Sequence, residues 1–266
     1  MRDQNLFKDK VVWLTGASSG IGKELSIQLA ELGAKLVLSS RKEELLQALK
    51  EGLPNSKEHL VLPLDLTRSS DFESALNQVI AQYGCVDYLI QNGGVSQRGT
   101  AADSTETVVR KIMEVNFFGN VLLTRVVLPE LRKSKGQILV ISSIAGKFGF
   151  FLRSSYSASK HALHGYYESL ALEEEENGIA VTIACPGKIN TPISSNAVGS
   201  DGQKHGQMDH NQEKGMPVEE CVSQLLNALS TKKREVLIGN REIKAVTLKR
   251  FLPALFWRVI KKQSAT

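Results

Sequence analysis

The feature that most constrains the fold of this chain is a regular alternation of short, continuous apolar runs with longer amphipathic segments. Six runs rich in Val, Ile and Leu begin at residues 11, 34, 59, 86, 136 and 178, and a shorter one begins at residue 235. Strands without a polar face are buried on both sides, which is typical of parallel sheets. Helical patterns fill the intervals, at residues 20–32, 42–51, 69–83, 104–133, 154–177 and 217–230. The alternation predicts an α/β fold, in which a doubly wound parallel sheet of about seven strands is flanked by helices.

Nothing in the composition divides the chain, so we predict a single domain. The 266 residues suffice for one large core, and we place a Rossmann-type domain at residues 1–239. Within it, residues 194–215 are polar and rich in Gly, Asn and Gln, and so long a loop is typical of a flexible substrate lid. Residues 240–266 form a basic amphipathic tail, which lies either on a membrane surface or on protein. We favour protein, because an apolar helix face in a globular chain usually packs on protein.

Composition and charge exclude several classes of function. The net charge of +5 is mild and is not gathered into a stripe, so we expect no nucleic-acid partner. The three cysteines are far apart and form no CxxC motif, which argues against a disulfide framework and favours a reducing compartment. His161 and His164 lack evident further ligands, so we expect no metal. The N-terminus has no signal-peptide pattern and no run of about 18 apolar residues occurs, which predicts a cytoplasmic protein, associated with a membrane surface only through the tail.

A glycine-rich stretch, TGASSGIG at residues 15–22, follows the first predicted strand and opens the first helix. Its glycines allow a tight turn and a close approach of the backbone to a diphosphate, which the free amides and the positive end of the helix then face. The spacing differs from the GxGxxG fingerprint, but the position between a strand and a helix favours a nucleotide site. The candidate cofactor-binding residues here are Gly16, Ser18, Ser19, Gly20, Ile21 and Gly22.

The end of the second strand should select between NAD and NADP. NAD binders usually place an acid there to hold the ribose hydroxyls, whereas NADP binders place a base near the 2′-phosphate. This chain has LSSRKEE at residues 38–44, so hydroxyls and a guanidinium fork end the strand in place of an acid. Arg41 and Lys42 would also suit the start of a solvated helix. The charge pattern nevertheless favours NADP(H), with Ser40 and Arg41 as phosphate ligands.

The chain closely resembles the short-chain dehydrogenases/reductases, over nearly its whole length up to about residue 239. The resemblance rests on motifs in family order and at family spacing: TGASSGIG, LDLT (64–67), QNGGV (91–95), VNFFG (115–119), ISSIAG (141–146), YSASK (156–160) and CPGKINT (185–191). The family usually has Asn-Asn-Ala-Gly where this chain has QNGG, a departure that retains Asn92. Within the family, the ASKHAL run at residues 158–163 looks most like the dehydrogenase/reductase member 7 group.

This resemblance implies a set of site residues. Asn116, Ser143, Tyr156 and Lys160 would form the catalytic tetrad, with Asn116 holding a water that links Lys160 to solvent. The turn after the sixth strand would border the nicotinamide and expose one of its faces, which implies transfer of the pro-S hydride. The candidate cofactor-binding residues added by the resemblance are Asp65, Leu66, Asn92, Gly93, Tyr156, Lys160, Pro186, Gly187, Ile189 and Thr191.

Tyr156 and Lys160 have the right spacing for acid–base chemistry. A free phenol has a pKa of about 10 and is a poor acid or base at neutral pH. A lysine four residues further on lies on the same helix face, and its ammonium group favours the phenolate, as does the positive nicotinamide of an oxidised cofactor. Tyr156 would then protonate a carbonyl oxygen, or deprotonate an alcohol, while Ser143 binds that oxygen.

These features together predict an NADP(H)-dependent oxidoreductase that interconverts a carbonyl and an alcohol. Phe148, Phe150 and Phe151 lie between Ser143 and Tyr156, which favours a hydrophobic small-molecule substrate, although these rings could instead pack under the lid. The resemblance implies a homodimer or homotetramer formed through the helices at 104–133 and 154–177. Two alternatives stay open: a 3-oxoacyl-thioester reductase, and a protein that binds NADP(H) as a redox sensor without turnover.

Overall fold

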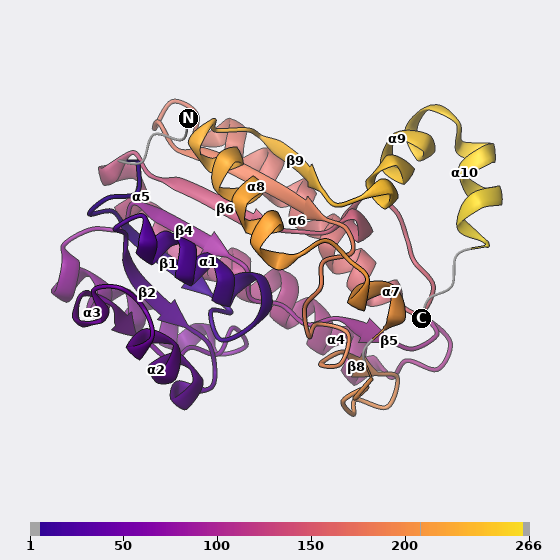
Figure 1. Cartoon of the computed structure of the whole chain (residues 1–266), viewed down its shortest axis with the longest axis horizontal. Coiled ribbons are helices and arrows are strands. Elements are labelled where there is room, and N and C mark those ends of the chain that lie inside the picture. The colour runs from indigo at the N-terminus through magenta and orange to yellow at the C-terminus, as the bar shows by residue number, and fades with distance from the viewer. Residues whose placement is uncertain (1–5, 208, 263–266) are drawn as a thin grey trace.

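A computed structural model describes residues 6–207 and 209–262 and confirms the doubly wound parallel sheet (Figure 1). Seven parallel strands lie in the order β3-β2-β1-β4-β6-β7-β9. They correspond to the seven apolar runs, in the same order along the chain. The strands are β1 Val11–Thr15, β2 Lys35–Ser39, β3 Leu60–Val61, β4 Tyr88–Gln91, β6 Gln137–Ile141, β7 Ala180–Pro186 and β9 Glu235–Ile238.

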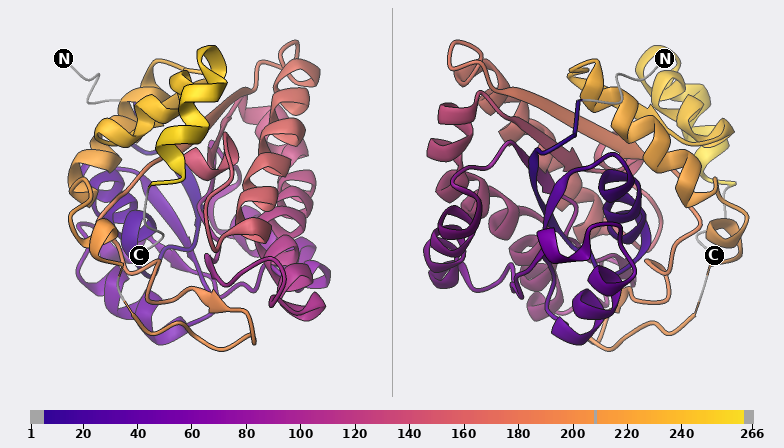
Figure 2. Two further views of the ribbon diagram at one scale, coloured as in Figure 1. Left: turned by 90° about the vertical axis from the view of Figure 1, so that its right-hand side faces the viewer. Right: turned by 60° about the vertical axis from the view of Figure 1, so that its left-hand side comes forward.

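Helices cover both faces of the sheet and enclose two apolar cores (Figure 2). Successive side chains of β1 alternate between these cores, so that Val12 and Leu14 join the first, and Val11 and Trp13 the second. This explains why the central strands carry no polar face. The first core is covered by α1 (Gly20–Glu31), α2 (Glu43–Glu51) and α8 (Val218–Ser230), and the second by α3 (Phe72–Tyr83), α5 (Gly119–Ser134) and α6 (Ser154–Glu173).

The winding of the sheet reverses between β1 and β4. From β1 the chain proceeds outward to β2 and β3, whereas β4, β6, β7 and β9 follow on the other side. The loops after β1 and β4 therefore separate, and such a switch point leaves a crevice at the carboxyl edge of the sheet. The glycine turn follows β1, the QNGG motif ends β4, and the segment with Ser143 follows β6. The topology thus brings three predicted site segments to one edge.

The helix predicted at residues 104–133 is continuous but irregular. It consists of α4 (Glu106–Met113), a π-helical segment (Glu114–Phe118) and α5. By length and composition alone, the run Glu106–Ser134 could cross a membrane. Much of its apolar surface packs on the sheet, because Leu123, Val127 and Leu131 are buried in the second core. Core packing is therefore sufficient to account for its apolar character.

The predicted lid at residues 194–215 contains regular structure. Its strand β8 (Val198–Gly199) pairs in parallel with β5 (Gln97–Arg98), which lies after β4. Further on, Asp209 precedes the short helix α7 (His210–Glu213). Ser194, Ala197 and Asp209 are buried, so this polar segment is packed against the domain at several points. The sequence pattern did not predict either of these short strands.

The tail forms two short helices rather than one. Pro253 cannot continue the first helix, and it is the first residue of the second. A 3-10 turn (Arg241–Ile243) leads into α9 (Lys244–Phe251), followed by α10 (Pro253–Ile260). Phe256 and Ile260 of α10 are buried in a small cluster with Phe148, and the rings of Phe148 and Phe256 lie 5.1 Å apart. The described part of the tail therefore docks on its own chain, which is the placement that we favoured. Other short turns are Ser56–Glu58, Ser69–Asp71 and Ile144–Gly146.

Candidate active site

The glycine turn leaves the N-terminus of α1 open toward the crevice. Gly16 and Gly20 have φ angles of 66° and 54°, a left-handed conformation that favours glycine. A Cβ on Gly22 would lie 2.2 Å from the Gly16 carbonyl oxygen, so this position must also be glycine. Ser19, at the N-cap of α1, makes no side-chain capping bond, and the first turn contains no acid. The amides at this end are therefore free of an internal anion, as an external phosphate requires.

Thr15, at the end of β1, and Asn92, just after the neighbouring strand β4, fix the shape of this turn. The Asn92 side-chain amide donates to the carbonyl oxygens of Thr15 (3.0 Å) and Gly16 (3.1 Å). The Thr15 hydroxyl accepts from the backbone amides of Asn92 (3.1 Å) and Gly93 (2.9 Å). The chain departs from the family pattern at Gln91 and Gly93: Gln91 donates to the Asn120 carbonyl on the helix side, whereas Gly93 lines the crevice. Thr15 was not among the predicted residues, although it stands directly before the glycines.

The end of β2 offers groups that suit a phosphate. The Ser40 hydroxyl is buried and has no partner among the described residues. Arg41 is exposed beside it and forms no ion pair within the described part of the chain. On the same side, just after β3, Asp65 accepts from the amide (2.9 Å) and hydroxyl (2.8 Å) of Thr67. Although burial opposes it, these bonds and the positive charges of Arg41 and Arg68 keep the pKa of Asp65 below its usual value.

Tyr156 and Lys160 lie in the first turns of α6, as the sequence predicts. Both side chains are buried, and the Lys160 ammonium lies 5.8 Å from the centroid of the Tyr156 ring. Lys160 donates to the Ile141 carbonyl at 2.8 Å, a bond that fixes one of its three protons. Burial lowers the pKa of Lys160 to about 8. Burial also raises the pKa of Tyr156, against which Arg153, Ser143 and Arg98 act in the opposite direction.

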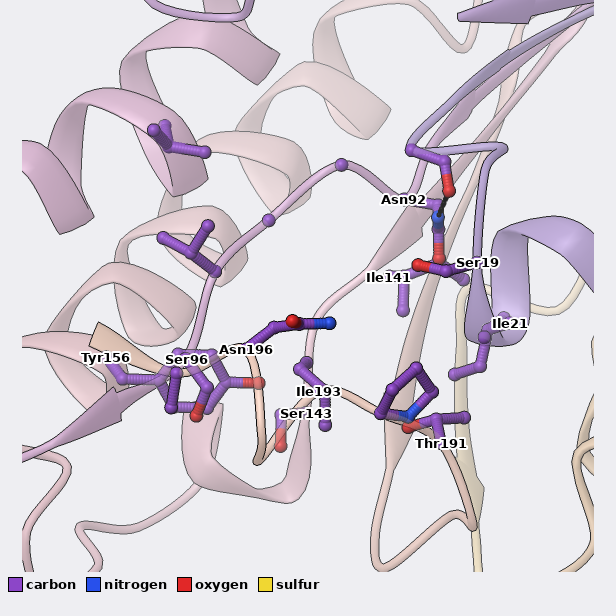
Figure 3. A pocket seen from close by; sticks show the side chains of 18 of the residues that line it. Ser19, Ile21, Asn92, Ser96, Ile141, Ser143, Tyr156, Thr191, Ile193 and Asn196 are labelled. Carbon is purple, nitrogen blue, oxygen red and sulfur yellow. Dashed lines mark hydrogen bonds between the residues drawn. The ribbon is translucent and has the colours of Figure 1, made fainter. Parts of the chain in front are cut away.

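Ser143 and Asn116 complete the predicted tetrad in different ways. Ser143 caps the turn after β6, where its hydroxyl accepts from the Ala145 amide at 3.1 Å, and it lies near Tyr156 in the pocket (Figure 3). Asn116 lies in the π-helical segment and is fully buried. Its side-chain oxygen accepts from the Val95 amide at 2.8 Å. Its side-chain nitrogen donates to the Val95 carbonyl at 2.9 Å and to the Ser159 hydroxyl at 3.0 Å. The π-helical turn is thus tied to the strand that follows the QNGG motif and to the helix of Tyr156.

One cleft of about 630 Å³ joins these groups. Tyr156, Ser143 and Asn196 lie toward one end of it, and Ser19, Ile21 and Thr191 toward the other (Figure 3). Every predicted catalytic and cofactor-binding residue lines it except Gly22 and Asn116, which support its wall from behind. The lining thus includes Gly16, Ser18, Ser19, Gly20, Ile21, Ser40, Arg41, Asp65, Leu66, Asn92, Gly93, Ser143, Tyr156, Lys160, Pro186, Gly187, Ile189 and Thr191.

The cleft suits a dinucleotide. Its glycine cradle has no room for side chains, since a Cβ on Gly93 would lie 2.6 Å from Leu66. The open end of α1 lies at the end of the cleft away from Tyr156, and the unpartnered Ser40 hydroxyl belongs to the same lining. Phosphates at the helix end and on Ser40 would satisfy donors that the protein leaves free. The residues present therefore fit a nicotinamide dinucleotide.

Gln97 is the most informative residue that the sequence patterns missed. Its side-chain oxygen accepts from the backbone amides of Ser155 (2.9 Å) and Tyr156 (3.2 Å), at the start of α6. Arg153, at the N-cap position of this helix, provides no side-chain cap, so a residue of β5 performs this role. Gln97 is completely buried. No local motif marks such a cap, because the acceptor lies 58 residues from the amide of Ser155.

A second polar group, part buried and part exposed, lies where α6 meets β7 and β9. His164, Cys185 and Glu235 have ligand atoms within 4.8 Å of one another, an arrangement compatible with a metal ion. Lys147, however, binds Glu235, and burial raises the pKa of Cys185 to about 12. Burial also lowers the pKa of His164 to about 4. His164 and Cys185 are buried and pack in the core, whereas Glu235 is exposed and pairs with Lys147.

Comparison with known proteins agrees with the geometry. The model of the short chain dehydrogenase family matches residues 10–201. Dehydrogenase/reductase SDR family member 7B of Mus musculus is 37% identical over 271 residues, covering 99% of this chain and 84% of that protein. Dehydrogenase/reductase SDR family member 7 of Homo sapiens is 38% identical over 262 residues, covering 96% of this chain and 77% of that protein.

Solved structures lead to the same family. A short-chain dehydrogenase from Streptomyces avermitilis has a TM-score of 0.79 and 26% identity, with 96% of each chain covered. One from Burkholderia phymatum, in complex with NAD, has a TM-score of 0.81 over 94% of this chain and 95% of its own; its 22% identity supports the fold alone. The chain therefore belongs to the short-chain dehydrogenase/reductase family of oxidoreductases, in the group that resembles dehydrogenase/reductase member 7.

Proposed function

We propose that this protein is an NADP(H)-dependent oxidoreductase that interconverts a carbonyl and an alcohol on a hydrophobic small molecule. The observation that carries the proposal is the position of Tyr156, buried at one end of a dinucleotide-shaped cleft with Ser143 and Lys160 beside it. A protein that only binds the cofactor, as in the redox-sensor alternative, needs no buried acid at that end.

The chemistry of the proposal divides between the cofactor and the protein. When bound, the nicotinamide supplies a hydride to the carbonyl carbon or accepts one from the alcohol carbon. Tyr156 gives its hydroxyl proton to the oxygen in reduction and takes it back in oxidation. Ser143 orients that oxygen by a hydrogen bond. Lys160, whose pKa is lowered by burial to about 8, is still mostly protonated at neutral pH, so its charge favours the phenolate.

The preference for NADP(H) rests on the end of β2. An unpartnered Ser40 hydroxyl and an exposed Arg41 offer a donor and a guanidinium fork for a 2′-phosphate. Arg41→Asp should reverse the charge there and shift the ratio of NADPH to NADH use by at least about tenfold toward NADH. Lys42→Asp is the matched control for a neighbouring cation. Equal use of both cofactors by the unaltered protein would refute the preference.

The hydrophobic substrate is inferred from the lining beyond Tyr156. Phe150, Phe151 and Ile193 line that end of the cleft, and the rings of Phe148 and Phe150 lie 4.8 Å apart. A 3-oxoacyl-thioester would need an open mouth for its carrier, but Phe151 and the segment of residues 194–215 stand at this mouth. Catalytic efficiency across a panel of ketones should therefore rise with apolar size. A preference for acyl thioesters would favour the alternative reductase.

We propose that two surfaces are used for assembly. Phe118 and Leu172, on the π-helical segment and on α6, are 45% and 64% exposed, which suits the homodimer contact implied for these helices. The tail leaves Phe251, Leu255 and Trp257 exposed beside Lys249 and Arg250, which suits peripheral contact with an anionic membrane. Leu172→Lys should weaken the proposed dimer and so lower the molecular mass measured by analytical ultracentrifugation. Trp257→Glu should reduce binding to phosphatidylserine vesicles, and unchanged binding would end the membrane proposal.

The decisive experiment is oxidation of NADPH and NADH with a panel of ketones, aldehydes and acyl thioesters. Tyr156→Phe should bind the cofactor normally and lose nearly all turnover, because the phenol proton is gone while the ring remains. Tyr166→Phe, on the same helix but half-exposed, is the matched control and should remain active. Retained turnover in Tyr156→Phe would refute the mechanism.

A further inference from the structure

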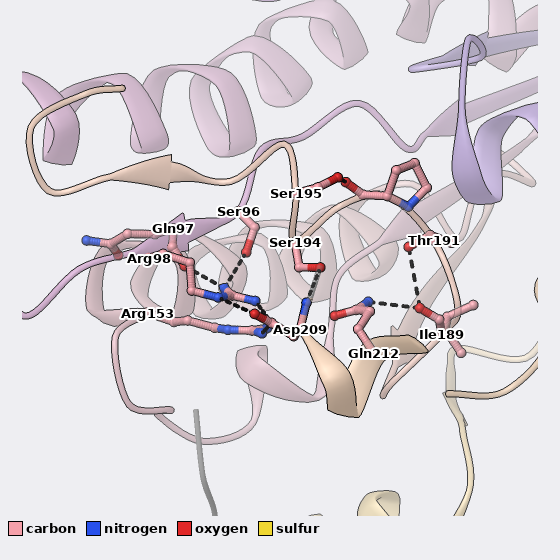
Figure 4. A network of polar contacts seen from close by, with 11 residues as sticks. Ser96, Gln97, Arg98, Arg153, Ile189, Thr191, Ser194, Ser195, Asp209 and Gln212 are labelled. Atoms are coloured by element: carbon pink, nitrogen blue, oxygen red, sulfur yellow. Dashed lines mark hydrogen bonds and ion pairs between the residues drawn. The ribbon is translucent and has the colours of Figure 1, made fainter. Parts of the chain in front are cut away.

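A buried cluster of charges lies beside Tyr156 and has no place in the proposed chemistry. Arg98 binds Asp209 with two nitrogens, one of them at 3.2 Å, and Arg153 binds the same carboxylate at 3.0 Å (Figure 4). Arg98 also donates to the Gln97 carbonyl at 2.6 Å and to the Ser96 hydroxyl at 3.3 Å. Only 2% of the Arg98 side chain and 4% of the Asp209 side chain are exposed. This cluster of Arg98, Arg153 and Asp209 is called the charge triad below.

The charge triad joins three separate segments. Arg98 ends β5, Arg153 lies three residues before Tyr156 at the start of α6, and Asp209 belongs to the segment of residues 194–215. Backbone contacts support the same junction, because β5 pairs with β8 and the Gly99 amide donates to the Leu152 carbonyl at 3.1 Å. Asp209 is thus the direct link between the segment over the substrate end and the helix of the proposed acid.

The charges of the triad do not cancel. Two guanidinium groups face one carboxylate, so the triad leaves about one positive charge in a largely buried site, in which the Arg153 side chain is 21% exposed. Among the described residues, Arg98 of β5 and Arg153 at the N-cap of α6 act on the Tyr156 phenol, the Lys160 ammonium lies 5.8 Å from its ring, and Asp209 pairs with both guanidiniums. Both guanidiniums act to lower the pKa of Tyr156, against the effect of burial. Buried ion pairs alone seldom add stability, which favours a role in the site.

We propose that Arg98, Arg153 and Asp209 are positioning residues, which fasten the segment of residues 194–215 to the catalytic helix and set the charge beside the Tyr156 hydroxyl. The proposal rests on the proposed function, since it acts through Tyr156 as acid and base. With Asp209 engaged, the phenol faces the residual charge of the triad. Without it, the same phenol faces two uncompensated guanidiniums. The Asp209 carboxylate therefore determines both how the segment of residues 194–215 is attached and how acidic the Tyr156 hydroxyl is.

This arrangement makes a prediction that a purely mechanical attachment does not. Arg153→Gln and Asp209→Asn break the same ion pair, but they change the charge near Tyr156 in opposite directions. Loss of a cation should raise the apparent pKa of alcohol oxidation by about one unit, because the phenolate is less favoured. Loss of the carboxylate should lower it by about one unit, because the phenolate is more favoured. A mechanical attachment would give both variants the same higher KM and no displacement of the pH profile.

The test is the pH profile of kcat/KM for oxidation of the best secondary alcohol from the panel, with NADP⁺ in excess. Tyrosinate absorbance of the NADP⁺ complex, with that of Tyr156→Phe subtracted, gives the same ionisation without turnover. Arg153→Lys keeps the charge and should keep the profile, whatever it does to KM. Arg234→Gln and Glu175→Gln are matched controls, because they break an exposed ion pair, 62% and 63% exposed, at the other end of α6.

Opposite displacements of the two profiles would support the proposal, and displacements in one direction, or none, would overturn it. If Asp209→Asn fails to fold, the comparison of Arg153→Gln with Arg153→Lys decides, because only the former should move the profile. The proposed function is tested separately: an active Tyr156→Phe would remove Tyr156 as the acid. An inactive Tyr156→Phe with unmoved Arg153→Gln and Asp209→Asn profiles would leave the function standing and reject the charge triad alone.

Discussion

Gln97→Met should separate the backbone support of Tyr156 from its chemistry. The Gln97 oxygen is the side-chain acceptor for the amides of Ser155 and Tyr156, at 2.9 and 3.2 Å, in a fully buried position. Met has nearly the same length and leaves little cavity, so the change mainly removes this acceptor. Leaving a buried donor unsatisfied costs about 1–3 kcal/mol, so the two amides together should cost about 3 kcal/mol of the free energy of unfolding.

The loss should appear both in stability and in turnover. About 3 kcal/mol corresponds to a fall of about 6–12 °C in Tm for a chain of this size. The start of α6 would also move, and a displacement of the phenol by about 1 Å lowers kcat by roughly tenfold to a hundredfold. Cofactor affinity should change little, because the glycine turn lies at the other end of the cleft. Calorimetric unfolding and steady-state kinetics measure these effects.

Ser104→Ala is the matched control for this experiment. The Ser104 hydroxyl accepts from the Gln97 side-chain nitrogen at 2.9 Å, so its loss touches the same amide group but leaves the two caps of α6 in place. We expect a cost below about 1 kcal/mol, since this bond is partly exposed, and an unchanged kcat. The reasoning would be refuted if Gln97→Met were no less stable than Ser104→Ala, or if it kept full turnover.

Three further predictions concern the cleft, the tail and the pH dependence of stability. Gly22→Ala should weaken NADPH binding at least about tenfold in calorimetry, because its Cβ would lie 2.2 Å from the Gly16 oxygen at the phosphate turn. Phe256→Ala should cost roughly 3 kcal/mol of local stability and expose the tail to proteolysis, whereas Trp257→Ala, about half exposed, should not. Burial lowers the pKa of Lys160 from 10.5 to about 8, so the unfolded chain binds this proton more tightly between those values. Stability should therefore rise with pH across this window, and Lys160→Met should flatten the rise in chemical denaturation.

The parts of the structure that the sequence predicted are those with local causes. A short apolar run buried on both faces is typical of a strand inside a parallel sheet, and the five interior strands of the described sheet are such runs. Gly16 is required by its left-handed backbone conformation, and Gly22 by its close contact with the Gly16 carbonyl oxygen. Both causes lie within one turn, so the sequence motif alone predicts the turn. Tyr156 and Lys160 lie four residues apart on one helix, and the helical period alone places them together.

The parts that were not predicted have causes far away in the chain. Arg98 and Asp209 are separated by 111 residues, and each has the appearance of an ordinary surface residue in its own segment. Asn116 was identified by resemblance, but the π-helical turn that aims it at Val95 has no periodic signature. The strands β5 and β8 have two residues each, too short for any alternation to be visible. Pairing of such strands is decided by tertiary contacts rather than by local preference.

The two residues of β5 serve different partners. Successive side chains of a strand point to opposite sides, so Gln97 and Arg98 diverge (Figure 4). Gln97 reaches the backbone amides of α6, and Arg98 reaches the carboxylate of Asp209. The strand thus provides one neutral acceptor for the start of α6 and one cation for the charge triad. A substitution at either position should therefore affect the same phenol by a different route, through its position at Gln97 and through its charge at Arg98.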